Sequence, residues 1–389
     1  MIEQLRADGD LIAAVRALTG GGDVEESLAR IAWSVIAEPG DGDAGRLIEA
    51  YGAVHALHAA VGGDALLSGG RDRASADAMV RWATRAEPGA VANAIRSAEH
   101  IGATLLTPSD RRWPASVDDL GVHAPVVLWV RGDPTLLCAE PRASIVGARA
   151  STAYGDSVAA ELSADLAAGG AVIVSGAAYG IDGAAHRAAL SVDGGTVAFL
   201  AGGVDRAYPQ GHASLLGRIA ERGSVVSEVP CGTAPTKWRF LARNRLIAAL
   251  SDATVVVEAG WRSGSLNTAG HAAALGRPLG AVPGPVTSAA SAGCHRLLRE
   301  YDAQCVTTAA DVRELWGGAQ VSAAPGGAED GDRTRVRDAL STRTSVSAVE
   351  VARRSGMSPQ RVGAVLGFLE LDGEAVRDDG GWRRGRGGR

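Results

Sequence analysis

Apolar residues recur every three or four positions over roughly the first 110 residues, a spacing typical of helices that bury one face. The repeat is clear in residues 11–18 and 28–35. Residues 47–57 predict helix, glycine turn and helix, as in helix-hairpin-helix or sterile-alpha-motif-like folds. We therefore predict a helical domain over residues 1–110 and expect it to be an accessory packing domain.

From residue 125 to about residue 316 the pattern changes to short, continuous apolar runs that alternate with helical segments. The runs lie at residues 125–130, 144–147, 172–175, 196–201, 224–227, 253–258, 278–283 and 305–307. Such runs are typical of parallel strands that are covered on both faces. They predict an α/β domain over residues 111–317, whose ligands would lie beyond the carboxyl ends of the strands.

The last part of the chain predicts a linker and a small module. Residues 318–332 are rich in Gly, Ala and Pro and have no apolar period, which indicates a flexible linker. A capping box at Ser347–Glu350 begins one helix, Gly356 ends it, and Ser358 with Pro359 begins a second helix. Residues 374–383 predict a β-hairpin. Helix, turn, helix and hairpin predict a winged helix over residues 333–389.

Three strand-to-helix turns are rich in small residues and carry or adjoin arginine, a composition suited to phosphate. A helix N-terminus has unpaired N–H groups and a partial positive charge, and small residues let an anion approach the backbone. Several such turns at one sheet edge suggest a polyanion more than a single nucleotide. The candidate residues are Gly147 and Arg149, then Ser175, Gly176 and Tyr179, then Arg262, Ser263, Gly264 and Ser265.

Residues 237–245 form the most suggestive stretch for nucleic acid, because four cations interleave with two aromatic residues. Bases can stack on an aromatic ring while arginine holds the backbone. Alternatively, Trp238 and Phe240 belong to the core and the cations are solvated; of the two rings, we expect Phe240 to be the more exposed. The candidates here are Lys237, Arg239, Phe240, Arg243, Asn244 and Arg245.

Composition narrows the function classes further. The net charge of −5 argues against indiscriminate nucleic-acid binding but allows a local basic groove. Lys237 is the only lysine, so nearly all fixed positive charge is arginine. The four cysteines form no CxxC pair and no apolar run is long enough to span a membrane, so we expect a cytoplasmic protein without a metal site or membrane contact.

No catalytic constellation is apparent, and we expect no enzyme. No turn matches GxGxxG, so we predict no nicotinamide or other cofactor. Asp182 and His186 stand four residues apart, but a helix cap and a structural histidine explain them adequately. Glu258, at the end of its apolar run, could order the arginine-bearing turns. For the winged helix, DNA contact and protein packing remain open alternatives.

Several long motifs in one order resemble the bacterial DNA-processing protein DprA (Smf) family, over about residues 100–310. They lie at residues 145–149, 175–186, 208–209, 227–228, 240–248, 263–269 and 281–284. The resemblance implies an extended Rossmann-like domain that binds single-stranded DNA, forms a homodimer and loads the RecA recombinase in natural transformation. Helical N-terminal and winged-helix C-terminal additions also fit. The family's pocket motifs match Arg149, Gly176, Phe240, Arg243, Asn244, Arg245, Ser263, Gly264 and Ser265.

The chain departs from the family pattern at three positions. Ala148, Tyr179 and His212 stand where the family usually has serine, arginine and asparagine. These changes should weaken phosphate binding, which Tyr179 would partly offset by stacking. One alternative is therefore a RecA-binding adaptor with weak DNA affinity. The other is a nucleotide-processing hydrolase like the lysine decarboxylase-like proteins, although the turn at residues 260–265 lacks the glutamate of that group.

Overall fold

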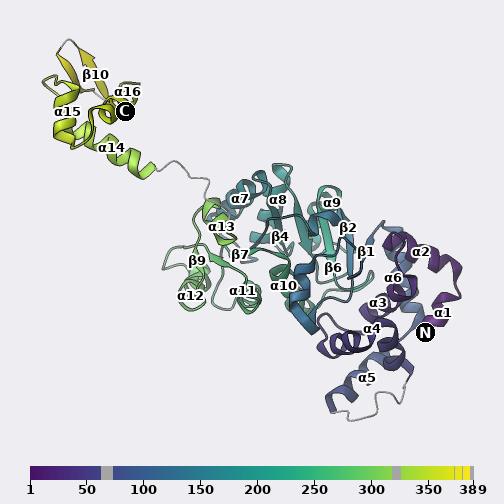
Figure 1. The fold of residues 1–389 in the computed structure, drawn as a ribbon. Coiled ribbons are helices and arrows are strands. Elements are labelled where there is room, and N and C mark those ends of the chain that lie inside the picture. The colour runs from purple at the N-terminus through teal and green to yellow at the C-terminus, as the bar shows by residue number, and fades with distance from the viewer. Residues whose placement is uncertain (63–72, 318–325, 372, 379, 386–389) are drawn as a thin grey trace. The chain divides into compact units, whose positions relative to one another are not determined.

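The computed structural model describes residues 1–62, 73–317, 326–371, 373–378 and 380–385. It divides into two compact units, Met1–Ala319 and Gln320–Arg389. The first unit holds the helical N-terminal region and a large sheet, and the second holds a small α/β module (Figure 1).

In the described part of the chain, nine strands form one sheet in the order β1-β2-β6-β5-β4-β3-β7-β8-β9. All neighbours from β6 to β9 are parallel, whereas β1 and β2 pair antiparallel at one edge. The strands are β1 (Thr104–Leu106), β2 (Leu128–Gly132), β3 (Arg142–Val146), β4 (Val172–Ser175), β5 (Thr196–Phe199), β6 (Ser224–Ser227), β7 (Ala253–Val256), β8 (Leu279–Ala281) and β9 (Gln304–Cys305).

The predicted Rossmann-like α/β fold is confirmed, with one correction at the sheet edge. Strand β1 was not predicted, and β2 runs antiparallel to β6 rather than parallel. An apolar run shows that a strand is buried but carries no information about its direction, and a three-residue edge strand is too short to show a period.

Helices cover both faces of the sheet (Figure 1). Residues of α7, α8 and α13 share one apolar core with β3, β4 and β7, and residues of α10, α11 and α12 share the core on the other face. These helices and α9 are α7 (Ala153–Ala168), α8 (Ile181–Ser191), α9 (Ala213–Arg222), α10 (Lys237–Leu250), α11 (Ser265–Ala274), α12 (Ala292–Glu300) and α13 (Ala309–Leu315). Short 3-10 helices are η2 (Ala115–His123), η3 (Pro134–Leu137), η4 (Gln210–His212) and η5 (Ala289–Ser291).

The N-terminal helices pack against the β1–β2 end of the sheet, where Leu105 and Trp129 join their core. Gly52 has φ +75° and divides α4 into two helical segments, as predicted for residues 47–57. The helices of this region are α1 (Ile2–Arg6), α2 (Gly9–Thr19), α3 (Val24–Ile36), α4 (Gly42–Gly62), α5 (Arg73–Arg85) and α6 (Pro88–His100).

The C-terminal unit is the predicted winged helix. It consists of α14 (Gly326–Ala339), α15 (Ala348–Ser355), α16 (Pro359–Leu371) and the antiparallel pair β10 (Ala375–Asp378) and β11 (Gly381–Arg384). The hydroxyl of Ser347 caps α15, but Glu350 pairs with Arg353 and Arg354 instead of completing the predicted capping box. Residues 326–332, predicted as linker, belong to α14, and residues 318–325 lie outside the described residues.

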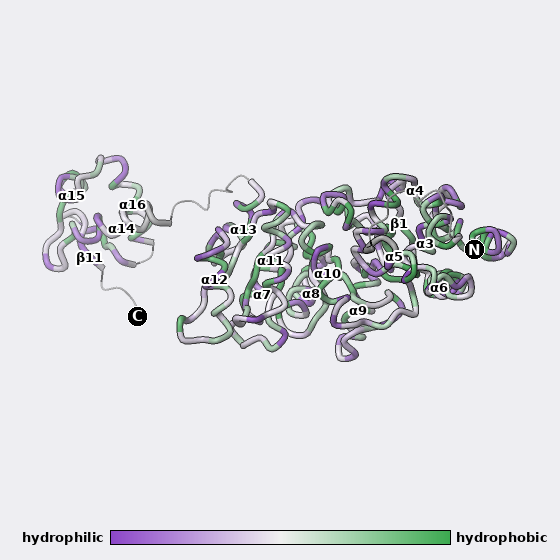
Figure 2. Tube along the Cα trace, turned by 90° about the horizontal axis from the view of Figure 1, so that it is seen from below, coloured by the Kyte–Doolittle hydropathy of each residue, from purple (hydrophilic) through white to green (hydrophobic). Residues whose placement is uncertain are grey.

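None of the helices in the described ranges is both long and apolar enough to cross a membrane. The helices that flank the sheet mix hydrophilic and hydrophobic residues along their length (Figure 2).

Candidate functional site

The candidate site lies where the order in which the chain adds strands to the sheet changes direction. Strands β3 and β7 are neighbours, but the connections from β3 lead to β4, β5 and β6 on one side and those from β7 lead to β8 and β9 on the other. The loops after two such strands diverge and leave a crevice at their carboxyl ends. Here the crevice is a pocket of about 820 Å³ between these two loops and α10.

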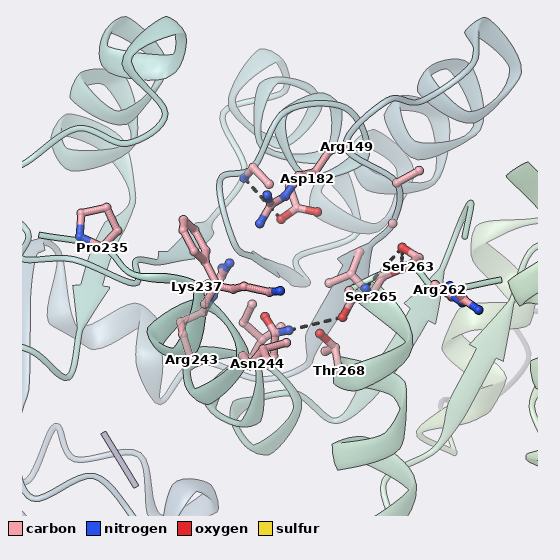
Figure 3. A pocket seen from close by; sticks show the side chains of 18 of the residues that line it. Arg149, Asp182, Pro235, Lys237, Arg243, Asn244, Arg262, Ser263, Ser265 and Thr268 are labelled. Carbon is pink, nitrogen blue, oxygen red and sulfur yellow. Dashed lines mark hydrogen bonds between the residues drawn. The ribbon is translucent and has the colours of Figure 1, made fainter. Parts of the chain in front are cut away.

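Ten of the fifteen residues predicted for the site line this pocket (Figure 3). They come from the loop after β3, from the first half of α10 and from the turn before α11. They are Gly147 and Arg149, then Lys237, Phe240, Arg243 and Asn244, then Arg262, Ser263, Gly264 and Ser265.

Buried Glu258 holds the loop that carries Arg149. Its carboxylate accepts hydrogen bonds from the backbone N–H of Thr152 at 2.9 Å and from the Thr152 hydroxyl at 2.6 Å, and its carbonyl accepts one from the N–H of Ala148 at 2.7 Å. A Cβ at position 155 would lie 2.3 Å from the carboxylate, so Gly155 makes the room for it. The prediction that Glu258 orders the arginine-bearing turns is confirmed for this loop.

Two aromatic rings and a guanidinium form a platform at one wall of the pocket. The guanidinium of Arg149 lies 5.0 Å from the ring centre of Phe240. The ring of Tyr208 lies 5.3 Å from that of Phe240, with 51° between their planes. Tyr208 also lines the pocket and was not among the predicted site residues; its Tyr-Pro motif was the signal that could have placed it there.

A buried cation, Arg243, reaches the pocket from α10. Its guanidinium donates to the carbonyl of Phe199 at 2.9 Å, and burial lowers its pKa to about 10, so it remains protonated at neutral pH. The nearby carboxylate of Asp182 accepts the N–H groups of Gly176 and Ala178, and burial raises its pKa. A Cβ on Gly176 would lie 1.6 Å from the Arg243 guanidinium. Glycine is therefore required where the arginine passes.

The pocket is electropositive. Arg149, Lys237 and Arg262 are exposed, and none of them has an acidic partner among the described residues. Asp182 is the one acid in the pocket lining, and it is 6% exposed. Uncompensated cations around a concave surface favour an anionic ligand.

The remaining five predicted site residues do not line the pocket, because other groups already bind them. Arg239 pairs with Glu38 at 3.1 Å, and Arg245 makes a buried bidentate pair with Glu228 at 2.7 Å. The hydroxyl of Ser175 donates to the carbonyl of Ile145, and the N–H of Gly176 is donated to Asp182. Tyr179 is 48% exposed and contacts His212 and Gly211 instead. Arg245 is thus a structural residue, contrary to the expectation that it holds phosphate.

The turn before α11 offers fewer free donors than expected. The N–H groups of Ser263, Leu266 and Asn267 donate to backbone carbonyls three residues earlier. The hydroxyls of Ser263 and Ser265 lie 2.8 Å apart and can reach a ligand from the pocket wall. Asn244 binds Asn267 through its side chain at 3.2 Å and so fixes α10 against α11.

The expectation that Phe240 is more exposed than Trp238 is wrong. Trp238 is 60% exposed, whereas Phe240 is half-buried under Arg149 and beside Tyr208. Their two-residue separation places them on different faces of α10, and only Phe240 faces the pocket.

The groups considered for catalysis are bound within the fold. His186 is fully buried, its Nδ1 lies 2.7 Å from the hydroxyl of Thr196, and burial lowers its pKa to about 3. Glu258 is held by Thr152 and does not line the pocket, which disfavours the hydrolase alternative. Within the described ranges, no three His, Cys, Asp or Glu side chains are grouped so as to hold a metal ion.

Two family models match the chain. Residues 104–317 match DNA recombination-mediator protein A, and residues 320–381 match the DprA winged helix domain. The chain belongs to the DprA family. This is a family of DNA-processing proteins with a role in recombination, in agreement with the resemblance seen in the motifs.

Curated relatives agree with this assignment to the DprA family. A putative DNA processing protein DprA of Mycobacterium tuberculosis is 49% identical over 300 residues, which cover 72% of this chain and 77% of that protein. DNA processing protein DprA of Bacillus subtilis is 39% identical over 213 residues, which cover 55% of this chain and 71% of that protein.

Solved DprA structures share the fold. DprA of Streptococcus pneumoniae superposes with a TM-score of 0.62 at 31% identity and covers 75% of this chain and 97% of that structure. DprA of Helicobacter pylori, described for its single-stranded DNA binding mode, superposes with a TM-score of 0.51 at 32% identity and covers 55% of this chain and 95% of that structure.

Proposed function

We propose that this chain binds single-stranded DNA in the pocket between the β3 and β7 loops. The observation that carries the proposal is the arrangement around the Phe240 platform of three cations that have no acidic partner among the described residues, Arg149, Lys237 and Arg262. Cations supply phosphate affinity, and an aromatic ring stacks with any base. The single-stranded DNA binding mode described for the Helicobacter pylori relative supports this ligand.

The platform favours a single strand over a duplex. Phe240 is half-buried beneath Arg149 and beside Tyr208, so a base can reach it only if it is unstacked from its neighbours. In a duplex the bases are paired and stacked, and only the backbone and groove edges are accessible. The departures at Tyr179 and His212 leave the pocket cations in place, because these two side chains contact each other outside the pocket lining.

Fluorescence anisotropy of a labelled oligothymidylate over a salt series tests the proposal. With about three phosphates neutralised, at about −0.7 per contact on single strands, the slope of log affinity against log salt should be near −2. Arg149→Ala should weaken binding and make the slope shallower. Arg222→Ala, an exposed arginine on α9 paired with Asp193, should change neither. A salt-independent affinity, or equal affinity for a duplex of the same length, would contradict the proposal.

The finer role that the family suggests is that the bound strand is passed to the RecA recombinase, by a homodimer in the cytoplasm. We propose this transfer to RecA, the homodimer and the cytoplasmic location as well. A pull-down of RecA by the parent and by Arg149→Ala separates the two roles. Capture by both proteins, with loss of DNA binding only in the variant, would support a recombinase contact outside the pocket, and sedimentation of the unliganded protein would test the dimer.

A further inference from the structure

A second aromatic site lies beside the pocket, on the turn after β7. Trp261 stands between Gly260 and Arg262, which both line the pocket, and it is 60% exposed. The guanidinium of Arg296, on α12, lies 5.3 Å from the ring centre of Trp261 and 5.5 Å from that of Tyr301. Tyr301 is 39% exposed. An arginine thus lies against two exposed rings next to the phosphate pocket.

The backbone that carries this site is fixed. The N–H of Ala259 donates to the carbonyl of Ala290 at 2.8 Å, and the N–H of Gly293 donates to the carbonyl of Ala259 at 2.7 Å. Arg296 is held in turn by Glu300, whose carboxylate accepts from its Nε at 2.8 Å. A ring that is exposed yet held in place loses little conformational entropy when a ligand covers it.

We propose that Trp261 is a second base-stacking platform, which takes a nucleotide outside the pocket and so extends the path of the single strand toward α12. The proposal rests on the single-stranded DNA binding proposed above. The charges around the ring favour a phosphate-bearing polymer. Arg262, the next residue in the chain, is exposed without an acidic partner among the described residues, and Arg296, which is paired with Glu300, lies on the ring itself.

Affinities measured for oligonucleotides of different lengths distinguish binding at this platform from binding in the pocket. A short strand fills the pocket alone, whereas a longer one also reaches Trp261. We would measure the affinities of the parent, Trp261→Ala and Trp261→Phe for oligothymidylates from about 4 to about 16 nucleotides, a range that spans typical single-strand site sizes. Trp238→Ala is the matched control: Trp238 is also 60% exposed, but it lines a different groove, beside residues of α3 and α5.

The expected result is a loss that depends on length. Trp261→Ala should bind the longest strand about tenfold more weakly, in the range for one stacked base, and the shortest within about twofold of the parent. Trp261→Phe should retain most of the affinity, and Trp238→Ala should match the parent at every length. Thermal unfolding of each variant checks that the fold is intact.

Two results would overturn the proposal: equal affinity of Trp261→Ala and the parent for all lengths, or an equal loss at all lengths. Either leaves the proposed single-strand binding intact, provided that the parent binds and that Arg149→Ala binds more weakly. If the parent binds no oligonucleotide at low salt, the proposed function itself fails. If Trp261→Ala instead loses only the capture of RecA, the ring is a protein contact and the stacking proposal is wrong.

Discussion

At the scale of single residues, the site depends on a glycine that makes room for an arginine. Because a Cβ on Gly176 would lie 1.6 Å from the Arg243 guanidinium, the two positions are coupled. We expect Gly176→Ala to lower the free energy of unfolding by about 1–3 kcal/mol, the usual cost of overpacking. Urea denaturation measures this.

The double variant Gly176→Ala with Arg243→Ala tests the cause. Removing the guanidinium relieves the clash, so the double variant should be more stable than the sum of the two single losses predicts. Strict additivity would mean that the alanine is accommodated in some other way.

His186 gives the fold a pH dependence. Burial lowers its pKa from 6.5 to about 3, so below about pH 6.5 the unfolded chain takes up a proton that the folded chain refuses. Stability should therefore fall as pH falls through this window, by up to about 1.4 kcal/mol per pH unit. His186→Gln, which does not titrate, should lose less stability between about pH 6.5 and pH 5 than the parent does. Parallel curves for the two proteins would contradict this assignment.

At the scale of elements, two buried glutamates have different partners and therefore different structural roles. Glu258 fixes the loop after β3, and Glu228 neutralises Arg245 on the far side of α10. Glu258→Gln places an amide N–H₂ against one of the two hydrogen-bond donors of Thr152, so the loop after β3 should become less ordered. We expect single-strand affinity to fall about tenfold and the free energy of unfolding to fall by about 1–3 kcal/mol.

Glu228→Gln is the matched control, because it leaves a buried guanidinium without its charge partner. It should cost about 3–5 kcal/mol of stability while the folded fraction still binds the oligonucleotide as the parent does. Denaturation and anisotropy on both variants give the comparison. A loss of affinity with Glu228→Gln as large as that with Glu258→Gln would remove the special role of the loop.

The secondary-structure elements and much of the site could be predicted from the sequence, but the pairing of the charged side chains could not. The turns at Gly147–Arg149 and Arg262–Ser265 meet in one pocket because the carboxyl ends of neighbouring parallel strands share an edge, which patterning predicts. The roles of Arg239 and Arg245 could not be predicted. Their partners lie outside α10: Glu38 is 201 positions away in the chain, and Glu228 follows β6, 17 positions before Arg245. The sequence does not distinguish a paired cation on α10 from a free one.

Trp261 was missed for a related reason. It is one ring in a glycine-rich turn, and its partner Arg296 stands 35 positions further along the chain, on α12. The contacts between the end of β7, its following turn and the start of α12 bring the two together.

At the scale of the whole molecule, the two units have separate cores. Residues of α14, α15, α16 and β10 form one apolar cluster, and its members all lie in the C-terminal unit. The exposed face of α16 offers few groups to DNA: beside Gly363, Ala364 and Phe368 it shows Gln360 and Glu370, and its Arg361 is paired with Asp332. Good base readout needs several donors and acceptors on such a helix, so the winged helix is better suited to a protein contact.

A chain that ends at residue 317 tests this division, since every pocket-lining residue precedes that point. We expect it to bind the oligothymidylate within about threefold of the full chain and with the same salt slope, because no phosphate contact is lost. A slope that becomes shallower by about 0.7 or more would show that the C-terminal unit neutralises at least one phosphate. In that case Arg383→Ala in the full chain, on the β10–β11 hairpin, should reproduce part of the change. If the slope is unchanged, the arginines of the β10–β11 hairpin serve something other than the single strand, and the exposed Phe368 of α16 becomes the place to look for a protein partner.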